Sequence, residues 1–302
     1  MKKVDDVSAF NEALWRGETA TVARLAQKID PDGEDRWRRK PLAMAAQYGE
    51  LALVTLLLGR GAAADAGRRY LTPITYAARR GAADIVCVLR DAGATVSIAT
   101  SVYLGDRRAV ARVPEAACVV DEDDTPLLLH AAESLHAEIV ADLIDRGAVV
   151  AAGDRFGETA LHRVADLRHA DPELAFAVAT LLLDRGAAVD AINRDWVTPL
   201  HQAIRARNLA VARVLLARGA DPNARDKRGS TPLHRAVTST GAGGTAGTDA
   251  TPFIEALLAH GANASVPDKH GRTPRVAARA PAIRVLVASP PAPASPRRKR
   301  AP

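Results

Sequence analysis

The amino-acid sequence predicts an all-α protein built from repeated pairs of short helices. Three markers recur in a fixed order along its 302 residues: a Thr-Pro-Leu-His segment, a Gly-Ala pair, and an Asp- or Asn-containing turn with Gly. Aromatic residues make up only 4% of the chain, so Ala, Leu and Val must supply the core. Such small and branched side chains suit close packing of helix on helix.

The first marker predicts where helices begin. Thr-Pro-Leu-His occurs at 198–201 and at 231–234. Thr is a good N-cap, and Pro in the first helical position has no backbone N–H that would need a partner. Weaker copies begin at Thr72, Thr125, Thr159 and Thr273.

The unit at 198–230 shows all three markers. We predict a first helix over 200–206 and a second over 209–218. Apolar residues at spacings of three and four share one face of the second helix, namely Val211, Val214, Leu215 and Leu216. Gly219 ends that helix with positive φ, and residues 226–229 form a tight turn before the next unit.

Together these markers, and the 33-residue length of the best unit at 198–230, resemble the ankyrin-repeat family over residues 8–288. The resemblance implies antiparallel helix pairs stacked in a curved solenoid, with short hairpin fingers projecting at about a right angle. It also implies noncatalytic protein binding through the fingers and the concave helix face.

The markers divide residues 1–288 into an array of about nine units. Their expected starts are Ser8, Lys40, Thr72, Val96, Pro126, Thr159, Thr198, Thr231 and Thr273. The first and last units should act as polar-faced caps. In the last unit we expect four residues to cover the interior face: Ile283, Val285, Leu286 and Val287.

Three units depart from the pattern. The fourth has no room for a finger before Val96, and Pro114 interrupts its second helix, so we expect a weak joint near 95–124. The sixth unit has extra residues at 168–173 between its helices, and the eighth at 240–248.

Composition limits the function classes. An apolar share of 48% and a charged share of 25% are ordinary for a soluble folded protein. The net charge of +6 is modest, and part of it lies in the tail 289–302, which is rich in Pro and Ala, ends in a basic run and should be disordered. No apolar run reaches the length of a membrane span, so we expect no membrane association. With only Cys87 and Cys118, a reducing, cytoplasmic location is the simpler interpretation.

Catalytic, metal and cofactor sites find no support in the sequence. His162, His201 and His234 fill the same repeat position, where each imidazole can bond the capping Thr and a neighbouring backbone group; a shared metal or acid–base site is the less favoured alternative, because they lie one repeat apart. There is no zinc-site spacing. The Gly-rich run 241–247 lacks the Lys-Ser/Thr of a phosphate loop. We therefore expect no cofactor, no metal and no enzyme activity.

The resemblance places the interaction residues at the variable finger and first-helix positions. In this sequence they are Arg155, Phe156, Glu158, Arg194, Asp195, Trp196, Arg205, Lys227 and Arg228, with Ala206 and Ser230 beside them. Trp196 stands where the finger at 226–229 has Gly. Exposed aromatic residues are typical of binding surfaces, although this ring could instead fold back on its own finger.

The favoured function is an adaptor, scaffold or inhibitor that binds an unidentified protein partner as a monomer. One alternative is a basic protein associated with nucleic acid, for which the basic residues at 36–40, 68–70 and 79–80 would have to share a face. We do not expect nucleic acid as the main partner. The other alternative is an enzyme whose site lies in a degenerate unit or an insertion.

Overall fold

The fold is all-α, as the sequence predicts. The computed structural model describes residues 2–67, 71–113, 124–168, 170–238, 250–278 and 281–288. Eighteen helices lie in these ranges, with one isolated β-bridge between Gly153 and Thr159. The chain divides into two compact units, Met1–His130 and Ala131–Pro302, and each is described separately.

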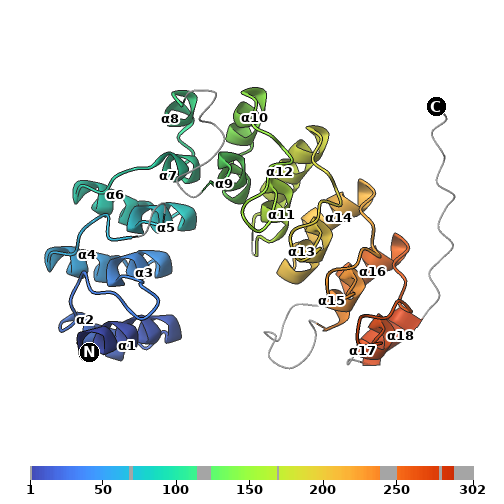
Figure 1. Ribbon diagram of the computed structural model, residues 1–302, viewed down its shortest axis with the longest axis horizontal. Helices are drawn as coiled ribbons and strands as arrows, with labels where there is room; N and C mark the ends of the chain where they lie inside the picture. The colour runs from blue at the N-terminus through green and yellow to red at the C-terminus, as the bar shows by residue number, and fades with distance from the viewer. Residues whose placement is uncertain are drawn as a thin grey trace. The chain divides into compact units, whose positions relative to one another are not determined.

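The first unit contains four helix pairs (Figure 1). They are α1 (Lys2–Arg16) with α2 (Thr19–Ala26), α3 (Pro41–Tyr48) with α4 (Leu51–Gly59), α5 (Pro73–Arg80) with α6 (Ala83–Asp91), and α7 (Ile98–Tyr103) with α8 (Arg107–Ala111). First helices pack on first helices, α1 on α3, α3 on α5 and α5 on α7. The boundary at His130 falls inside α9 (Leu127–Glu133).

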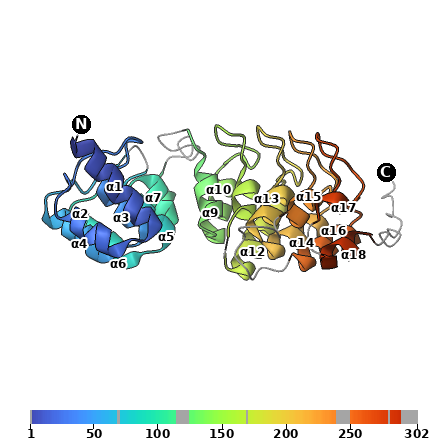
Figure 2. The same ribbon diagram turned by 90° about the horizontal axis from the view of Figure 1, so that it is seen from below.

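The second unit continues the same alternation. After α9, its helices are α10 (Ala137–Asp145), α11 (Ala160–Ala165), α12 (Pro172–Asp184), α13 (Pro199–Ala206), α14 (Leu209–Ala217), α15 (Pro232–Thr238), α16 (Thr251–Ala259), α17 (Pro274–Ala277) and α18 (Pro281–Ala288). Here α11, α13, α15 and α17 form one layer, and α12, α14, α16 and α18 form the other. Figure 2 shows the connecting fingers of this unit standing side by side, all projecting from the same side of the helices.

Local signals set the helix ends. Thr198 caps α13, and its hydroxyl accepts a hydrogen bond from the His201 amide at 3.4 Å. Asn208 caps α14, where its Oδ1 accepts from the Val211 amide at 3.2 Å, while its Nδ2 donates to the Val164 carbonyl of the preceding unit. Gly219 follows α14 with a φ of 87°, as the sequence predicts. Asn208 therefore both caps a helix and joins two successive repeats.

Apolar faces of the helices form the core of each unit. The four residues expected to share a face of α14 are all buried: Val211, Val214, Leu215 and Leu216. This helix packs against α12 on one side and α16 on the other. Leu215 is completely buried, which confirms the expected register of this unit.

The fourth helix pair is degenerate, as predicted. Between Gly93 and the start of α7 at Ile98 there is no finger, and α8 has only five residues. Pro114 and residues 115–123 of the expected joint lie outside the described residues. So do the insertion at 240–248, the basic residues at 68–70 and the tail at 289–302, and the domain boundaries stay a prediction.

Three sequence expectations were wrong in detail. The first helix begins at Lys2, ahead of the expected start at Ser8. The extra residues of the sixth unit partly lengthen α12 to 13 residues, because Asp171 caps the helix and Pro172 occupies its first turn. In the last unit Val285 is 71% exposed, whereas Ile283 and Val287 are buried. A spacing of four, from 283 to 287, selects the buried face there and leaves Val285 opposite.

Removing the Leu215 side chain tests the register of the array. We expect Leu215→Ala to lower the free energy of unfolding by about 2–5 kcal/mol, because the neighbouring units cannot fully collapse onto the cavity. Arg213→Ala, on the exposed face of the same helix, is the matched control and should change it little. Urea denaturation measures both, and equal midpoints for the two variants would contradict the register.

Candidate functional site

Each finger of the second unit is held at its base by one Asp or Asn side chain. In the finger at 226–230, Asp226 Oδ1 accepts hydrogen bonds from the amides of Arg228 at 2.8 Å and Ser230 at 2.9 Å. The Asp226 amide donates to the Ser230 carbonyl at 3.0 Å, and the Gly229 amide to the Asp226 carbonyl at 2.8 Å. These four bonds close the turn without any contribution from the tip side chains, which are left free to vary.

The same arrangement recurs in the other fingers of this unit. The base residues are Asp154, Asn193 and Asp268, and each accepts two backbone amides at 2.8–3.0 Å. The fourth position of each turn has positive φ, with Gly157, Trp196 and Gly271 matching Gly229. The fingers therefore share one backbone conformation.

Neighbouring fingers are joined to one another at their tips. The amide of Arg194 donates to the Phe156 carbonyl at 2.8 Å, Lys227 to Asp195 at 2.9 Å, and Lys269 to Arg228 at 3.0 Å. Each bond runs from the second residue of one finger to the third residue of the finger before it. This ladder fixes the tips of all four fingers in register.

Arginine side chains neutralise the base carboxylates. Arg163 donates to Asp154 Oδ2 at 2.6 Å, and Arg235 donates to Asp226 Oδ2 at 2.9 Å. Burial opposes ionisation of Asp226, but hydrogen bonds from Ser230, Arg235 and Arg228 outweigh it, so the pKa of Asp226 lies below its ordinary value. The Asp226 carboxylate is therefore ionised at pH 7, and both carboxylates are already paired with an arginine inside the fold.

The finger at 193–197 uses a neutral version of this pair. Asn193 replaces the Asp and Gln202 replaces the Arg. Gln202 turns to the preceding finger, where its Nε2 donates to Glu158 Oε1 at 2.6 Å, while Asn193 Nδ2 donates to the same oxygen at 3.4 Å. The Glu158 carboxylate thus bridges two fingers, and Gln202 Oε1 is buried without a hydrogen-bond partner in the described part of the chain.

Three histidines below the fingers link successive units. Nδ1 of His201 accepts the Thr198 amide at 3.3 Å, and its Nε2 reaches the Ser230 carbonyl at 3.0 Å. His162 and His234 make the equivalent contacts to the carbonyls of Val197 and Arg272. This confirms the structural interpretation of the three residues. Burial, reinforced by nearby Arg235, lowers the pKa of His201 to about 4, so its imidazole is neutral at pH 7.

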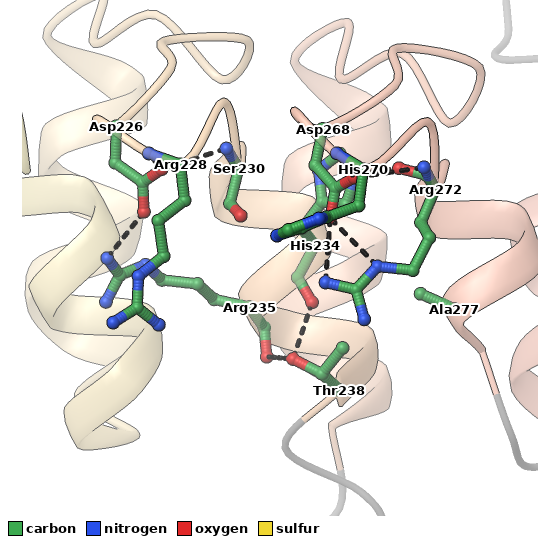
Figure 3. A pocket seen from close by; sticks show the side chains of 10 residues that line it. All are labelled: Asp226, Arg228, Ser230, His234, Arg235, Thr238, Asp268, His270, Arg272 and Ala277. Carbon is green, nitrogen blue, oxygen red and sulfur yellow. Dashed lines mark hydrogen bonds and ion pairs between the residues drawn. The ribbon is translucent and has the colours of Figure 1, made fainter.

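Two adjoining cavities lie between the fingers and the first helices of the second unit. One has a volume of about 460 Å³ and is bounded by the fingers that contain Asp226 and Asp268. Figure 3 shows Arg228, Arg235 and Arg272 lining this cavity, with His270 beside them. The other, of about 420 Å³, extends toward Glu158. They share three wall residues, Asp226, Arg228 and Arg235, and together form what we call the finger groove.

Two aromatic side chains stand out from these fingers. Phe156 is 53% exposed and lies under the Arg155 guanidinium, 4.9 Å from the ring centroid. Trp196 is 52% exposed and has a φ of 59°, in the left-handed region. The left-handed conformation costs a residue with a Cβ about 1–2 kcal/mol, and half of the indole remains in solvent. Folding stability thus gains little from a Trp at this position.

The structure brings five of the nine expected interaction residues to the finger groove: Glu158, Asp195, Arg205, Lys227 and Arg228. Arg155, Phe156, Arg194 and Trp196 are exposed on the fingers outside its lining. Arg205 pairs with Asp166 at 2.8 Å, and Glu158 is engaged with Gln202. Their roles in partner binding stay a prediction.

Sequence reasoning missed several residues that line the groove. Arg235, Arg272 and Gln202 lie on or just before first helices and were overlooked because they fall beside strong core positions. A signal was present, since the base residue and the position nine residues later read Asp154 with Arg163, Asn193 with Gln202, and Asp226 with Arg235. Where the base residue is Asn in place of Asp, the residue nine positions later is Gln in place of Arg. This joint change indicates that the two side chains form a pair.

The basic finger of the first unit has a different character. The finger at 34–40 contains Trp37. The guanidinium carbons of Arg36 and Arg39 lie 3.7 Å and 4.5 Å, respectively, from the centroid of its ring. Most of its basic residues have acidic partners, in the pairs Arg38 with Glu34, Arg39 with Asp35 and Lys40 with Asp32. This charge balance weakens the nucleic-acid alternative for these residues.

No group of three or more His, Cys, Asp or Glu side chains in the ranges that the structure describes could hold a metal ion. Among the helices of those same ranges, none is both long and apolar enough to cross a membrane.

Comparisons with known proteins identify repeats in both units. Residues 10–100 match the family model described as ankyrin repeats (3 copies), and residues 182–236 match the model described as ankyrin repeats (many copies). No curated protein matches the chain. The second match includes α13, α14 and two of the fingers that border the groove.

Acid should destabilise the stack through its buried histidines. Because the pKa of His201 is depressed in the folded state, the unfolded chain binds its proton first, and stability falls as the pH drops from about 6.5 to about 4. We expect His201→Gln, which cannot be protonated, to reduce this slope. Thermal melts between about pH 7 and pH 4 test it, and parallel curves for both proteins would show that His201 does not link folding to pH.

Proposed function

Because the chain is an ankyrin-repeat protein, we propose that residues 131–302 bind a partner protein through the finger groove and the finger tips, without catalysing a reaction. Ankyrin repeats generally mediate interactions between proteins. An array of stacked units presents a long surface to which several repeats contribute side chains. The roles that fit such binding are those of an adaptor, a scaffold or an inhibitor in a reducing, cytoplasmic compartment.

Trp196 is the observation that carries this proposal. It occupies a turn position that the other fingers of the second unit give to Gly157, Gly229 and Gly271. The chain thus accepts an unfavourable backbone conformation and an exposed indole together. Unfavourable backbone conformations without a folding benefit concentrate at functional sites. Trp is also among the residue types that dominate binding free energies at interfaces.

The surroundings of Trp196 suit a binding surface. The tip ladder and the base hydrogen bonds hold the fingers rigidly, so little conformational entropy is lost when a partner docks. Phe156 offers a second exposed aromatic side chain in the preceding finger. The groove below provides both donors and acceptors, which distinguish one partner from another.

Replacing Trp196 by Gly separates binding from folding. We expect Trp196→Gly to weaken binding of the native partner by about 2 kcal/mol, roughly 30-fold, as hot-spot truncations do. The melting temperature should change little, because relief of the left-handed conformation offsets the lost contacts of the half-buried ring. The partner is first recovered on the immobilised chain from cells that express it, and affinity is then measured with purified proteins.

The control for this experiment is Trp15→Ala. Trp15 lies on α1 in the first unit and is more exposed than Trp196, so its loss should alter neither folding nor affinity. If Trp196→Gly bound as tightly as the unchanged chain, the finger surface would not be the binding site. If it unfolded at a much lower temperature, the indole would be a packing residue.

A further inference from the structure

The finger tips of the second unit carry an aligned row of basic side chains. The second residue of every described finger in this unit is basic: Arg155, Arg194, Lys227 and Lys269. The tip ladder sets these residues in register from one finger to the next. Arg228, the next residue along its finger, adds a fifth positive charge, and all five are exposed. We call these five residues the basic ridge.

The ridge is short of acidic partners. Asp195 is the one carboxylate among the second and third residues of these four described fingers, and it pairs with Lys227 at 3.6 Å. Arg155 lies over the Phe156 ring. The side chains of Arg194, Arg228 and Lys269 form neither an ion pair nor a hydrogen bond with the described part of the chain.

The carboxylates at the finger bases cannot supply the missing charge. Asp226 and Asp268 each accept two backbone amides and an arginine, Arg235 and Arg272 respectively. The pKa of Asp268 is lowered to about 2, because hydrogen bonds from Arg272 and His270 outweigh the effect of burial. Each of these carboxylates is therefore already paired with its own arginine and does not neutralise the basic side chains at the tips.

The first unit provides an internal comparison. In its basic finger at 34–40, Arg38, Arg39 and Lys40 have acidic partners at Glu34, Asp35 and Asp32 respectively. Basic residues in this chain therefore do not remain unpaired simply because they lie on a finger. Arg36 of that finger, which lies over the Trp37 ring, has no acidic partner in the described ranges, so what sets the second unit apart is the alignment of several such charges in one row.

We propose that the basic ridge binds an acidic segment of the partner protein, an inference that rests on the proposed function. Carboxylates of that segment pair with Arg194, Arg228 and Lys269 along the row. Where the ridge meets the groove, Arg228 lines a cavity together with Arg235 and Arg272. This cavity can hold one further carboxylate of the segment. Exposed aromatic rings of Phe156 and Trp196 provide the apolar contacts.

Two features favour a protein over a nucleic acid as the occupant. Asp195 interrupts the row, and its side chain is 77% exposed in the middle of the ridge. Glu158 and Asp195 also line the adjoining cavity. A nucleic acid presents negative charge at every phosphate and would be repelled there, whereas a protein segment can place a neutral or basic residue opposite them.

A random peptide library selected on the full chain tests the inference. Enriched peptides should be rich in Asp and Glu, and their affinity should fall with added salt. A ridge variant, Arg194→Ser with Arg228→Ser and Lys269→Ser, should bind them about tenfold more weakly, the combined effect of three exposed ion pairs. Its matched control removes the same charges elsewhere, with Arg24→Ser, Lys28→Ser and Arg213→Ser, and should bind them as the unchanged chain does. Melting curves verify that both variants fold.

The possible outcomes separate this inference from the proposed function. If the enriched peptides were neutral or apolar and their binding required Trp196, the proposed function would stand, but the inference of an acidic segment would be overturned. Acidic peptides that bind the ridge variant and the control equally would also overturn it. If no peptide were enriched, peptide binding itself would be contradicted. A labelled DNA duplex that bound more tightly than the selected peptides, and lost affinity in the ridge variant, would replace the acidic segment with nucleic acid.

Discussion

One hydrogen-bonded side chain at the base of each finger determines what the rest of the binding surface can be. An Asp or Asn accepts two backbone amides of its own turn, so the turn closes whatever residues occupy the tip. The carboxylate then needs a cation to tolerate partial burial, and Arg163 and Arg235 supply it. Because acids and bases at this level cancel, the charge that remains on the surface is the charge of the tips. Within the five residues of a finger, the base residue therefore serves folding, and the side chains at the tip are left for recognition.

The link between successive units uses different chemistry in the two halves of the chain. In the second unit an imidazole spans from the capping Thr of one repeat to a backbone carbonyl of the following repeat. In the first unit two of the equivalent positions hold threonines, and Thr75 Oγ1 lies 2.7 Å from Thr100 Oγ1. A hydroxyl has a shorter reach than an imidazole, and the unit that begins at α7 is also the one without a finger. The hydroxyl pair thus joins two repeats that have no finger between them.

Much of the fold follows from the sequence because its determinants are local. Capping Thr residues, Pro in the first turn and Gly after the second helix act within a few residues, and they placed α13, α14 and the turn at 226–229 correctly. Details that depend on distant partners were not predictable in this way. The exposure of Val285 depends on which face of α18 meets α16, and the engagement of Glu158 depends on Gln202, 44 residues later. Of the candidate site, the finger positions and five of the groove residues were foreseen. Arg235, Arg272 and Gln202 were not, since their place in the groove walls arises only when neighbouring repeats stack.

The finger at 193–197 departs from its neighbours at three positions together. Asn193 replaces the Asp, Gln202 replaces the Arg, and Trp196 replaces the Gly. The first two changes compensate each other, since a neutral amide no longer needs a cation. The third has no compensation within the described fold, because the backbone is left-handed and the ring half exposed. Places where a sequence breaks its own local rule without a structural gain are expected at functional sites. This finger, with a neutral base and an exposed indole, stands between fingers whose tips are also basic, so an apolar ring lies within the row of positive charges.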